Sequence, residues 1–341
     1  MRGGCHMTQT PITLAADASV VAAVFNRRAS HLCFGLGDGT ARIVALDSGA
    51  AKEITLTGFG TVLALTQDMD DAGWLAGLDD GRLVRLDADG TIAELAKHQG
   101  KWIEQVASSP AGLRAYGAGK DAYVGDAKGF GPARAHPSTV AGLAFDPKGK
   151  RLAVAHYGGV SLWWVNSAES KAKLLPWKGS HVSVCWAPDG GYVMTAMQEN
   201  DLHGWRLPAA SDIRMSGYPT KVRALAWSTK PYFLATSGAD QIICWPFAGA
   251  GPSGKPPVEF GGRGTQLVTR VACHPAGDGL VAGYDNGEVT IGRISWRRMA
   301  LAREATKAEV TALAWSPDGR FVAVGDDGGH MTVMPVDLPP A

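Results

Sequence analysis

A unit of about 41 residues recurs along this chain, and that period constrains the fold more than any other feature of the sequence. The clearest copies are VTALAWSPDG (310–319), VAGLAFDPKG (140–149), HVSVCWAPDG (181–190) and VRALAWSTKP (222–231), and fainter copies begin at residues 20, 62, 103 and 268. A period of this length is typical of folds in which each unit buries its apolar face against the next unit. The sequence therefore predicts an array of repeated motifs.

A second motif follows each of these segments and indicates a strand, a tight turn and another strand. Examples are GLGDGTARIVAL from residue 35, GLDDGRLVRL from residue 77 and GDDGGHMTVM from residue 325. The pairs Asp38-Gly39, Asp80-Gly81 and Asn286-Gly287 accept positive φ in a two-residue hairpin loop. Clustered acids and glycines can also hold a metal or a phosphate, but a calcium loop needs carboxylates at alternate positions and a distant glutamate, which this sequence lacks. We therefore predict turns and no metal site.

The first strand of each repeat carries small residues and closes with an aromatic ring. Alanines at 224, 226, 312 and 314 suit an innermost strand, where neighbouring sheets converge and large side chains would collide. The closing rings are expected to fill the widening gap between sheets. They are Phe25, Phe145, Trp186, Trp227 and Trp315.

These motifs resemble those of the WD-repeat family of β-propellers over essentially the whole chain, from about residue 15 to residue 336. The matching parts are the aromatic-x-Pro-Asp/Lys-Gly turn, the hairpin turn and a tryptophan that ends the third strand. His136 stands nine residues before Phe145, where the family places a histidine. The Trp-Asp dipeptide is missing, because Trp163, Trp205 and Trp245 are followed by other residues, and the family's hydrogen-bonded tetrad is complete in no repeat. The chain thus resembles a degenerate member.

The resemblance implies an all-β fold, a single closed propeller of four-stranded antiparallel blades over residues 8–338. The repeat slots at 20, 62, 103, 140, 181, 222, 268 and 310 predict eight blades. Seven blades are the alternative, if the weak unit around Val62 or Ile103 is distorted. The segment TPITLAADA (10–18) is expected to pair with the last blade and so remove an open sheet edge. Residues 1–7 look like a tag or an alternative start.

Two segments depart from the period. The longest step, from 222 to 268, contains the Gly- and Pro-rich stretch 246–264, which predicts a mobile loop outside the sheet. The stretch 293–307 places Trp296 among basic residues. We expect a solvated outer strand there, although a contact with an acidic partner or RNA is the alternative.

Charge and cysteine content exclude several classes of protein. The formal net charge of +1 gives no bulk field for nucleic acid or an anionic membrane. The five cysteines are scattered singly, so neither a disulfide framework nor a clustered zinc site is expected, and a cytoplasmic location follows. The apolar run at 20–25 is too short to span a membrane. We expect no membrane association.

The sequence holds no catalytic signature, neither GxSxG nor GxxxxGK[ST], HExxH or Cys-x-x-Cys. Most histidines fall in or beside predicted strands, where a structural hydrogen bond is the expected role. Propellers that resemble lactonases hold a metal in the central channel, but the residues that flank the strand starts include only two carboxylates, Glu104 and Glu309. We therefore expect a non-enzyme without a cofactor. The alternative is a propeller that binds a small ligand or metal in its central channel and acts as a lactonase-like hydrolase.

The resemblance implies a scaffold that binds a protein or peptide through the loops at the channel mouth, as a monomeric propeller within a larger complex. Exposed aromatic and arginine side chains dominate such binding surfaces. Trp102 is the first candidate because it precedes a strand start, and packing against a neighbouring loop is its structural alternative. The partner-binding candidates are Trp102, Tyr157, His181, Lys221, Arg223, Arg270 and Tyr284.

Overall fold

A computed structural model describes residues 10–58, 60–166 and 171–337 of the chain, and within these ranges it contains strands and no helix. The fold is an all-β propeller built from antiparallel sheets, each mostly of four strands. The chain divides into two compact units, residues 1–36, 42–51 and 222–341 in the first and 37–41 and 52–221 in the second. Residues 1–7, expected to be a tag or an alternative start, lie outside the described residues.

The first unit holds three complete sheets and most of a fourth. In each of them the strands follow one another in the sheet as they do in the sequence, except that β1 is added beside β31. The strands are β1 (Ile12–Ala15), β2 (Val20–Phe25), β3 (His31–Leu36), β4 (Thr40–Ala45), β5 (Ala51–Thr55), β21 (Leu225–Thr229), β22 (Tyr232–Thr236), β23 (Ile242–Pro246), β24 (Val258–Phe260), β25 (Val268–Cys273), β26 (Gly279–Tyr284), β27 (Val289–Arg293), β28 (Arg298–Arg303), β29 (Val310–Trp315), β30 (Phe321–Asp326) and β31 (His330–Pro335).

The second unit holds three sheets of four, five and six strands. Its strands are β6 (Val62–Gln67), β7 (Trp74–Leu78), β8 (Arg82–Leu86), β9 (Ile92–Lys97), β10 (Gln105–Ser109), β11 (Leu113–Ala118), β12 (Asp121–Asp126), β13 (Gly129–Phe130), β14 (Arg134–Ala135), β15 (Gly142–Phe145), β16 (Arg151–Trp164), β17 (Lys173–Trp186), β18 (Tyr192–Met197), β19 (Leu202–Arg206) and β20 (Ser211–Met215).

The described residues form seven connected sheets, which agrees with the alternative count of seven and not with the expected eight. The cause is strand β17, whose first half pairs with β16 and whose second half pairs with β18. Ser180 pairs with Tyr157 and the next residue, His181, pairs with Met197, so hydrogen bonding passes between two repeats without a break. The units at 62 and 103, which were expected to be weak, each form a sheet of their own.

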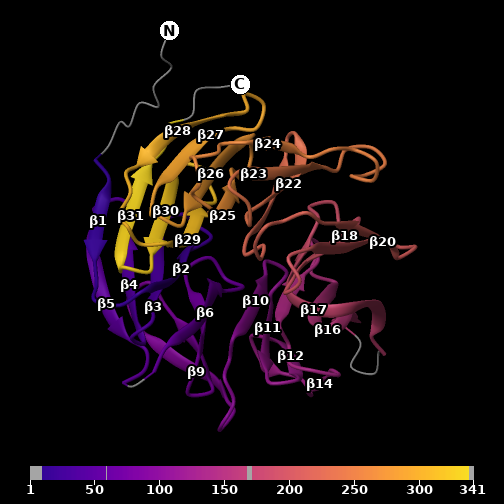
Figure 1. The fold of residues 1–341 in the computed structure, drawn as a ribbon. Helices are drawn as coiled ribbons and strands as arrows, with labels where there is room; N and C mark the ends of the chain where they lie inside the picture. The colour runs from indigo at the N-terminus through magenta and orange to yellow at the C-terminus, as the bar shows by residue number, and fades with distance from the viewer. Residues whose placement is uncertain (1–9, 59, 167–170, 338–341) are drawn as a thin grey trace. The chain divides into compact units, whose positions relative to one another are not determined.

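Strand β1 pairs antiparallel with β31, from Ile12 opposite Val333 to Ala15 opposite His330 (Figure 1). The last repeat thereby gains its fourth strand from the N-terminal segment, as the resemblance implied. In the same unit, the Thr311 hydroxyl donates to the Val20 carbonyl at 2.5 Å. The first and last repeats of the chain are therefore in direct contact.

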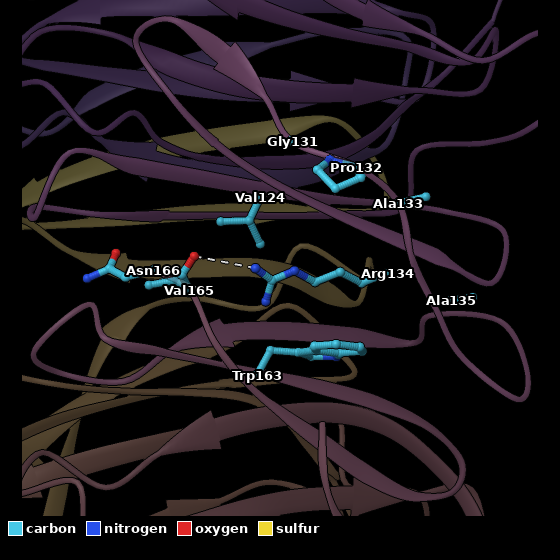
Figure 2. A pocket seen from close by; sticks show the side chains of 9 residues that line it. All are labelled: Val124, Gly131, Pro132, Ala133, Arg134, Ala135, Trp163, Val165 and Asn166. Atoms are coloured by element: carbon cyan, nitrogen blue, oxygen red, sulfur yellow. Dashed lines mark hydrogen bonds between the residues drawn. The ribbon is translucent and has the colours of Figure 1, made fainter. Parts of the chain in front are cut away.

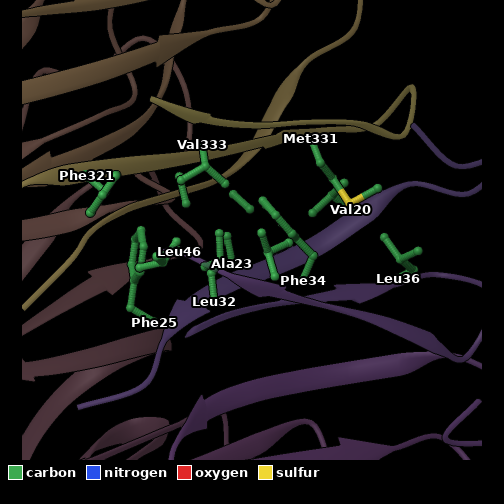
Figure 3. Packing of buried hydrophobic residues seen from close by; sticks show 13 residues of the cluster. Val20, Ala23, Phe25, Leu32, Phe34, Leu36, Leu46, Phe321, Met331 and Val333 are labelled. Carbon is green, nitrogen blue, oxygen red and sulfur yellow. The ribbon is translucent and has the colours of Figure 1, made fainter. Parts of the chain in front are cut away.

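Burial rises from the outer strand to the middle of each sheet, because both faces of the middle strands are covered. All six residues of β18, β26 and β30 are buried, whereas the outer strands β5, β9 and β28 are largely exposed. A core cluster in the first unit joins side chains of β2, β3 and β4 to those of β29, β30 and β31 (Figure 3). These apolar contacts stabilise the packing of one repeat on the next.

The glycines of the hairpin turns have the positive φ that the sequence predicted. Gly81 has φ of 84°, and a Cβ there would lie 2.1 Å from the His98 carbonyl oxygen. Asp80 accepts a hydrogen bond from the backbone N–H of Arg82 at 3.0 Å, which fixes the turn. In the GDDGG segment, Asp326 is buried and accepts bonds from Thr306 and from the backbone of His330. The acids and glycines thus stabilise the backbone conformation of the turns.

The two departures from the period have different outcomes. The prediction that residues 246–264 lie outside the sheet is wrong in part, because Val258–Phe260 pair with β23 as its fourth strand. The prediction of an outer strand in 293–307 is confirmed by β28. There Arg293 pairs with Asp278 and Arg303 with Asp326, so two of the five basic residues of this stretch have a carboxylate partner.

Candidate protein-binding site

Most of the predicted binding residues lie at the edge where the first strand of a sheet begins. The pairing of neighbouring strands shows which residues lie at this edge. For example, Val310, the first residue of β29, pairs with Asp326, the last residue of β30. The start of a first strand and the end of the following second strand therefore lie together. We call such positions the strand-start edge of each unit, taken separately: Trp102, Tyr157 and Lys221 mark it in the second unit, and Arg223, Arg270 and Glu309 mark it in the first.

In the second unit, two aromatic rings project from the strand-start edge. Trp102 is 61% exposed although the next residue, Ile103, is fully buried. The Ile103 N–H donates to the Leu78 carbonyl at 3.1 Å and so holds the backbone that presents the indole. More than half of Trp102 is therefore open to solvent. Lys221, further along the chain, is partly exposed.

Tyr157 is 64% exposed at the end of the second strand of its repeat. A register irregularity between Tyr157 and Gly159 turns the strand at this point. The backbone N–H of Tyr157 donates to the Ser138 hydroxyl at 2.8 Å, which holds the bulge in place. A rigid backbone thus presents an exposed phenol ring.

In the first unit, the strand-start edge carries a charged cluster of two arginines and one glutamate. The Arg223 guanidinium lies 2.5 Å from a Glu309 carboxylate oxygen, and the Arg223 side chain is 52% exposed. The backbone N–H of Arg223 donates to the buried Ser237 hydroxyl at 3.0 Å. Arg270 donates to the backbone carbonyls of Thr311 and Thr269, at 2.7 and 2.9 Å. Three first strands contribute to this cluster.

Burial lowers the pKa of Arg270, whereas Glu309 raises it and Arg223 lowers it. An arginine remains charged across the accessible pH range. Two guanidinium groups therefore face a single carboxylate, which leaves an excess positive charge at this edge. Such a cluster favours an acidic group on a partner.

His181 and Tyr284 do not belong to the exposed edge, so the structure corrects their assignment as contact residues. Both are fully buried. His181 bonds to the Thr195 hydroxyl at 2.8 Å and to the Trp177 carbonyl at 3.1 Å. The Tyr284 hydroxyl donates to the Gly261 carbonyl at 2.5 Å, and burial raises the pKa of this phenol. Each is a core residue held by internal hydrogen bonds.

The described residues offer no arrangement for metal binding. No group of three or more His, Cys, Asp or Glu side chains that could hold a metal ion occurs in this part of the chain. The four cysteines that it includes, Cys33, Cys185, Cys244 and Cys273, form no disulfide, and burial raises the pKa of the thiols of Cys33, Cys244 and Cys273. Within the described ranges, no helix is long and apolar enough to cross a membrane.

A histidine and a tryptophan at the positions expected for the WD-repeat family contact each other. The Trp163 indole N–H donates to His136 Nε2 at 2.9 Å, and His136 Nδ1 lies 3.3 Å from the Lys120 carbonyl oxygen. Burial lowers the pKa of His136 to about 4. The next residue after Trp163 is Trp164 and not aspartate, so the contact retains two members of the family's tetrad.

Comparison with known proteins agrees with this geometry. The family described as the anaphase-promoting complex subunit 4 WD40 domain matches residues 271–337. A relative from Arabidopsis thaliana, "Cell division cycle 20.1, cofactor of APC complex", is 26% identical over 197 residues, which cover 53% of this chain and 41% of the relative. The chain is thus similar to WD-repeat β-propeller proteins.

Two further comparisons give similar results. A rice (Oryza sativa subsp. japonica) relative, "Chromatin assembly factor 1 subunit FAS2 homolog", is 24% identical over 197 residues, with 55% of this chain and 36% of the relative covered. Each match thus spans less than half of the curated relative. The crystal structure of the computationally designed Ika8 protein superposes with a TM-score of 0.75 at 19% identity, over 94% of this chain and 97% of that one. This last likeness concerns the fold alone.

Glu309 is the member of the strand-start edge that sequence reasoning missed as a binding-site residue. It was expected to flank a strand start, and the structure shows that it sets the position of Arg223. The two residues lie 86 positions apart, but each comes next to a repeat slot, Arg223 after 222 and Glu309 before 310. Opposite charges at matching positions of different repeats were the available signal.

Proposed function

We propose that this WD-repeat protein is a non-enzymatic scaffold that binds another protein or peptide through the strand-start edge. Trp102, Tyr157, Arg223 and Arg270 are its main contact residues, and Lys221 adds a cation. We propose that these edges lie at the mouth of the central channel, as the likeness to WD-repeat propellers implies. The observation that carries the proposal is the exposure of large aromatic rings and an arginine on a backbone that buried neighbours hold fixed.

The chemistry of the edge supports binding to a folded or extended polypeptide. Exposed Trp, Tyr and Arg side chains supply most of the energy at protein interfaces. The excess positive charge around Glu309 selects for an acidic group. The net charge of +1 gives no general attraction to nucleic acid, which needs many cations along its backbone.

The relatives support a role inside a complex. One of them is named as a cofactor of the APC complex and another as the homologue of a chromatin assembly factor subunit. We propose by analogy that this chain acts as a single propeller within a larger assembly. The described cysteines form no disulfide, which suits a reducing compartment, and we therefore propose a cytoplasmic location.

We further propose that the pairing of β1 with β31 fastens the ring of sheets that this family builds. The bond from Thr311 to Val20 supports this proposal, because it joins the last repeat to the first. An unpaired β31 would present an open row of backbone donors and acceptors. The N-terminal strand would therefore protect the protein from self-association.

The proposal is tested by affinity capture from a lysate of the source cells. The bait is the wild-type protein, the double variant Trp102→Ala/Arg223→Ala, or a matched double variant, Trp296→Ala/Arg320→Ala. The matched variant removes the same residue types from exposed positions outside the strand-start edge. We expect a protein that is retained by the wild type and by the matched variant but lost from the edge variant. Equal recovery on all three baits would exclude the edge as the binding surface.

A further inference from the structure

A pocket of about 400 Å³ lies in the second unit, away from the strand-start edge residues, where the outer strand of one sheet is interrupted. That strand is divided into β13 and β14 by Gly131, Pro132 and Ala133, and both pieces pair with β12. Proline cannot donate to a strand ladder, so the pairing stops there. Val124, Pro132, Trp163 and Val165 provide apolar walls (Figure 2).

Arg134 crosses this pocket with its guanidinium against the Trp163 ring (Figure 2). The distance from Cζ to the ring centroid is 5.1 Å, which is within the range of a cation–π contact. Its two terminal nitrogens donate to the carbonyls of Trp164 and Val165 at 3.3 and 3.4 Å, which are long bonds. Burial lowers the pKa of Arg134.

Arg134 differs from the other arginines that lie over tryptophan rings in the described part of the chain. Arg151 lies over Trp186 at 4.5 Å and bonds to the Asp146 carboxylate at 2.9 Å. Arg293 lies over Trp296 at 5.2 Å and pairs with Asp278. For Arg134, no carboxylate among the described residues is within ion-pair distance. Within the described ranges, the pocket therefore holds a stacked cation without a carboxylate partner.

We propose that this pocket binds an acidic side chain, glutamate or aspartate, of a protein partner. The carboxylate would pair with Arg134, and the side-chain carbons would contact Val124, Pro132 and Val165. A planar guanidinium that lacks a carboxylate partner matches a carboxylate in shape and charge. One cation among apolar walls suits a single side chain, whereas a nucleic-acid backbone requires a row of cations. This inference rests on the proposed scaffold function and adds a second contact to it.

The test uses a blocked acidic peptide, acetyl-Ala-Glu-Ala-amide, and its glutamine counterpart as probes. The readout is the NMR resonance of the indole N–H of Trp163, a residue that lines the pocket. We expect saturable shifts with the glutamate peptide. For the glutamine peptide, or in Arg134→Gln, we expect affinity lower by about fivefold or more. Arg151→Gln is the matched control and should bind the glutamate peptide as the wild type does.

Several results would overturn the inference. One is an equal response to both peptides, and another is an equal response of Arg134→Gln and the wild type. A response to inorganic phosphate as strong as that to the peptide would show general anion binding. If Glu169→Gln, at a position outside the described residues, shifts the Trp163 resonance without peptide, the chain supplies its own carboxylate. None of these results depends on Trp102 or Arg223, so failure here is distinguishable from failure of the proposed function.

Discussion

The indole N–H of Trp315 donates a hydrogen bond of 3.1 Å to the backbone carbonyl of Ala272, one repeat earlier in the chain. Trp186 makes the same bond at 3.0 Å to Ala144, which is 42 residues before it. In each case the ring that closes a first strand reaches the carbonyl beside the equivalent position of the preceding repeat. In these two cases the bond links one repeat to the preceding repeat at nearly the same spacing along the chain.

Trp315→Ala is expected to destabilise the fold by roughly 3 to 5 kcal/mol, because the substitution removes a packed ring and leaves the Ala272 carbonyl without its donor. Urea unfolding monitored by circular dichroism measures the change in the free energy of unfolding. Trp296→Ala is the control, since this ring is half exposed and should cost less than about 1 kcal/mol. Equal losses in the two variants would contradict the packing role of Trp315.

Asp68→Ala should cost about 3 to 5 kcal/mol, because it leaves the buried guanidinium of Arg114 without its carboxylate. Arg114 bonds to both oxygens of Asp68, at 2.7 and 2.5 Å. Arg320→Ala, which breaks an exposed pair with Asp318, should cost less than about 1 kcal/mol. Denaturant titration of both variants gives the comparison. A loss at Asp68 as small as that at Arg320 would show that the buried pair contributes little.

Acid should destabilise the protein because of two buried histidines. Burial lowers the pKa of His136 and of His203 to about 4, whereas an unfolded histidine titrates near its ordinary value of 6.5. Between these values the unfolded state binds more protons than the folded state, so stability falls as the pH falls from about 6.5 to about 4. Each histidine contributes at most about 1.4 kcal/mol per pH unit in this window.

The variant His203→Phe isolates one half of this effect. The His203 ring stacks on the Trp177 ring, with 3.9 Å between the ring centroids. Neither nitrogen of His203 has a hydrogen-bond partner among the described residues. Phenylalanine would therefore keep the stacking contact without losing a hydrogen bond. We expect stability close to that of the wild type at neutral pH and a shallower loss between pH 6.5 and 4. The measurement is the urea midpoint at a series of pH values. If the stability of the variant falls with pH as steeply as that of the wild type, His203 does not contribute to the acid sensitivity.

Removal of residues 1–16 should expose the edge of β31 and promote self-association. The deletion takes away every residue of β1 that pairs with β31, from Ile12 to Ala15. Light scattering over a range of protein concentrations should show oligomers that the full chain does not form. The variant Thr13→Ala, which retains the strand, is the control. A truncated protein that stays monomeric and folds normally would contradict the proposed protective role.

Much of the fold could be predicted because individual residues in each repeat indicate where turns and strand ends lie. Asp80 and Gly81 indicate a turn by their own conformational preferences, and the ring of Trp315 marks the end of a first strand. The passage of β17 through two repeats could not be predicted, since it depends on the pairing of Ser180 with Tyr157 across the sheet. A sequence pattern locates strands, but it does not show where one sheet ends.

The site was harder to predict than the fold, because exposure depends on tertiary contacts. Trp102 and Tyr284 both lie beside strand starts or ends, yet one ring is exposed and the other is fully buried. The bond from the Tyr284 hydroxyl to the Gly261 carbonyl joins the end of β26 to the residue that follows β24, and no local pattern reveals it. Arg134 and Trp163 are likewise brought together only by folding.

The most direct test of the scaffold account is the dissociation constant for the purified partner recovered by capture, measured by isothermal titration calorimetry. Trp102→Ala/Arg223→Ala should weaken binding by at least about tenfold, because it removes two exposed residues of the kind that dominate interfaces. Trp296→Ala/Arg320→Ala should bind as tightly as the wild type, and all three proteins should melt at similar temperatures. Equal dissociation constants for the edge variant and the wild type would contradict the claim that the strand-start edge is the binding surface.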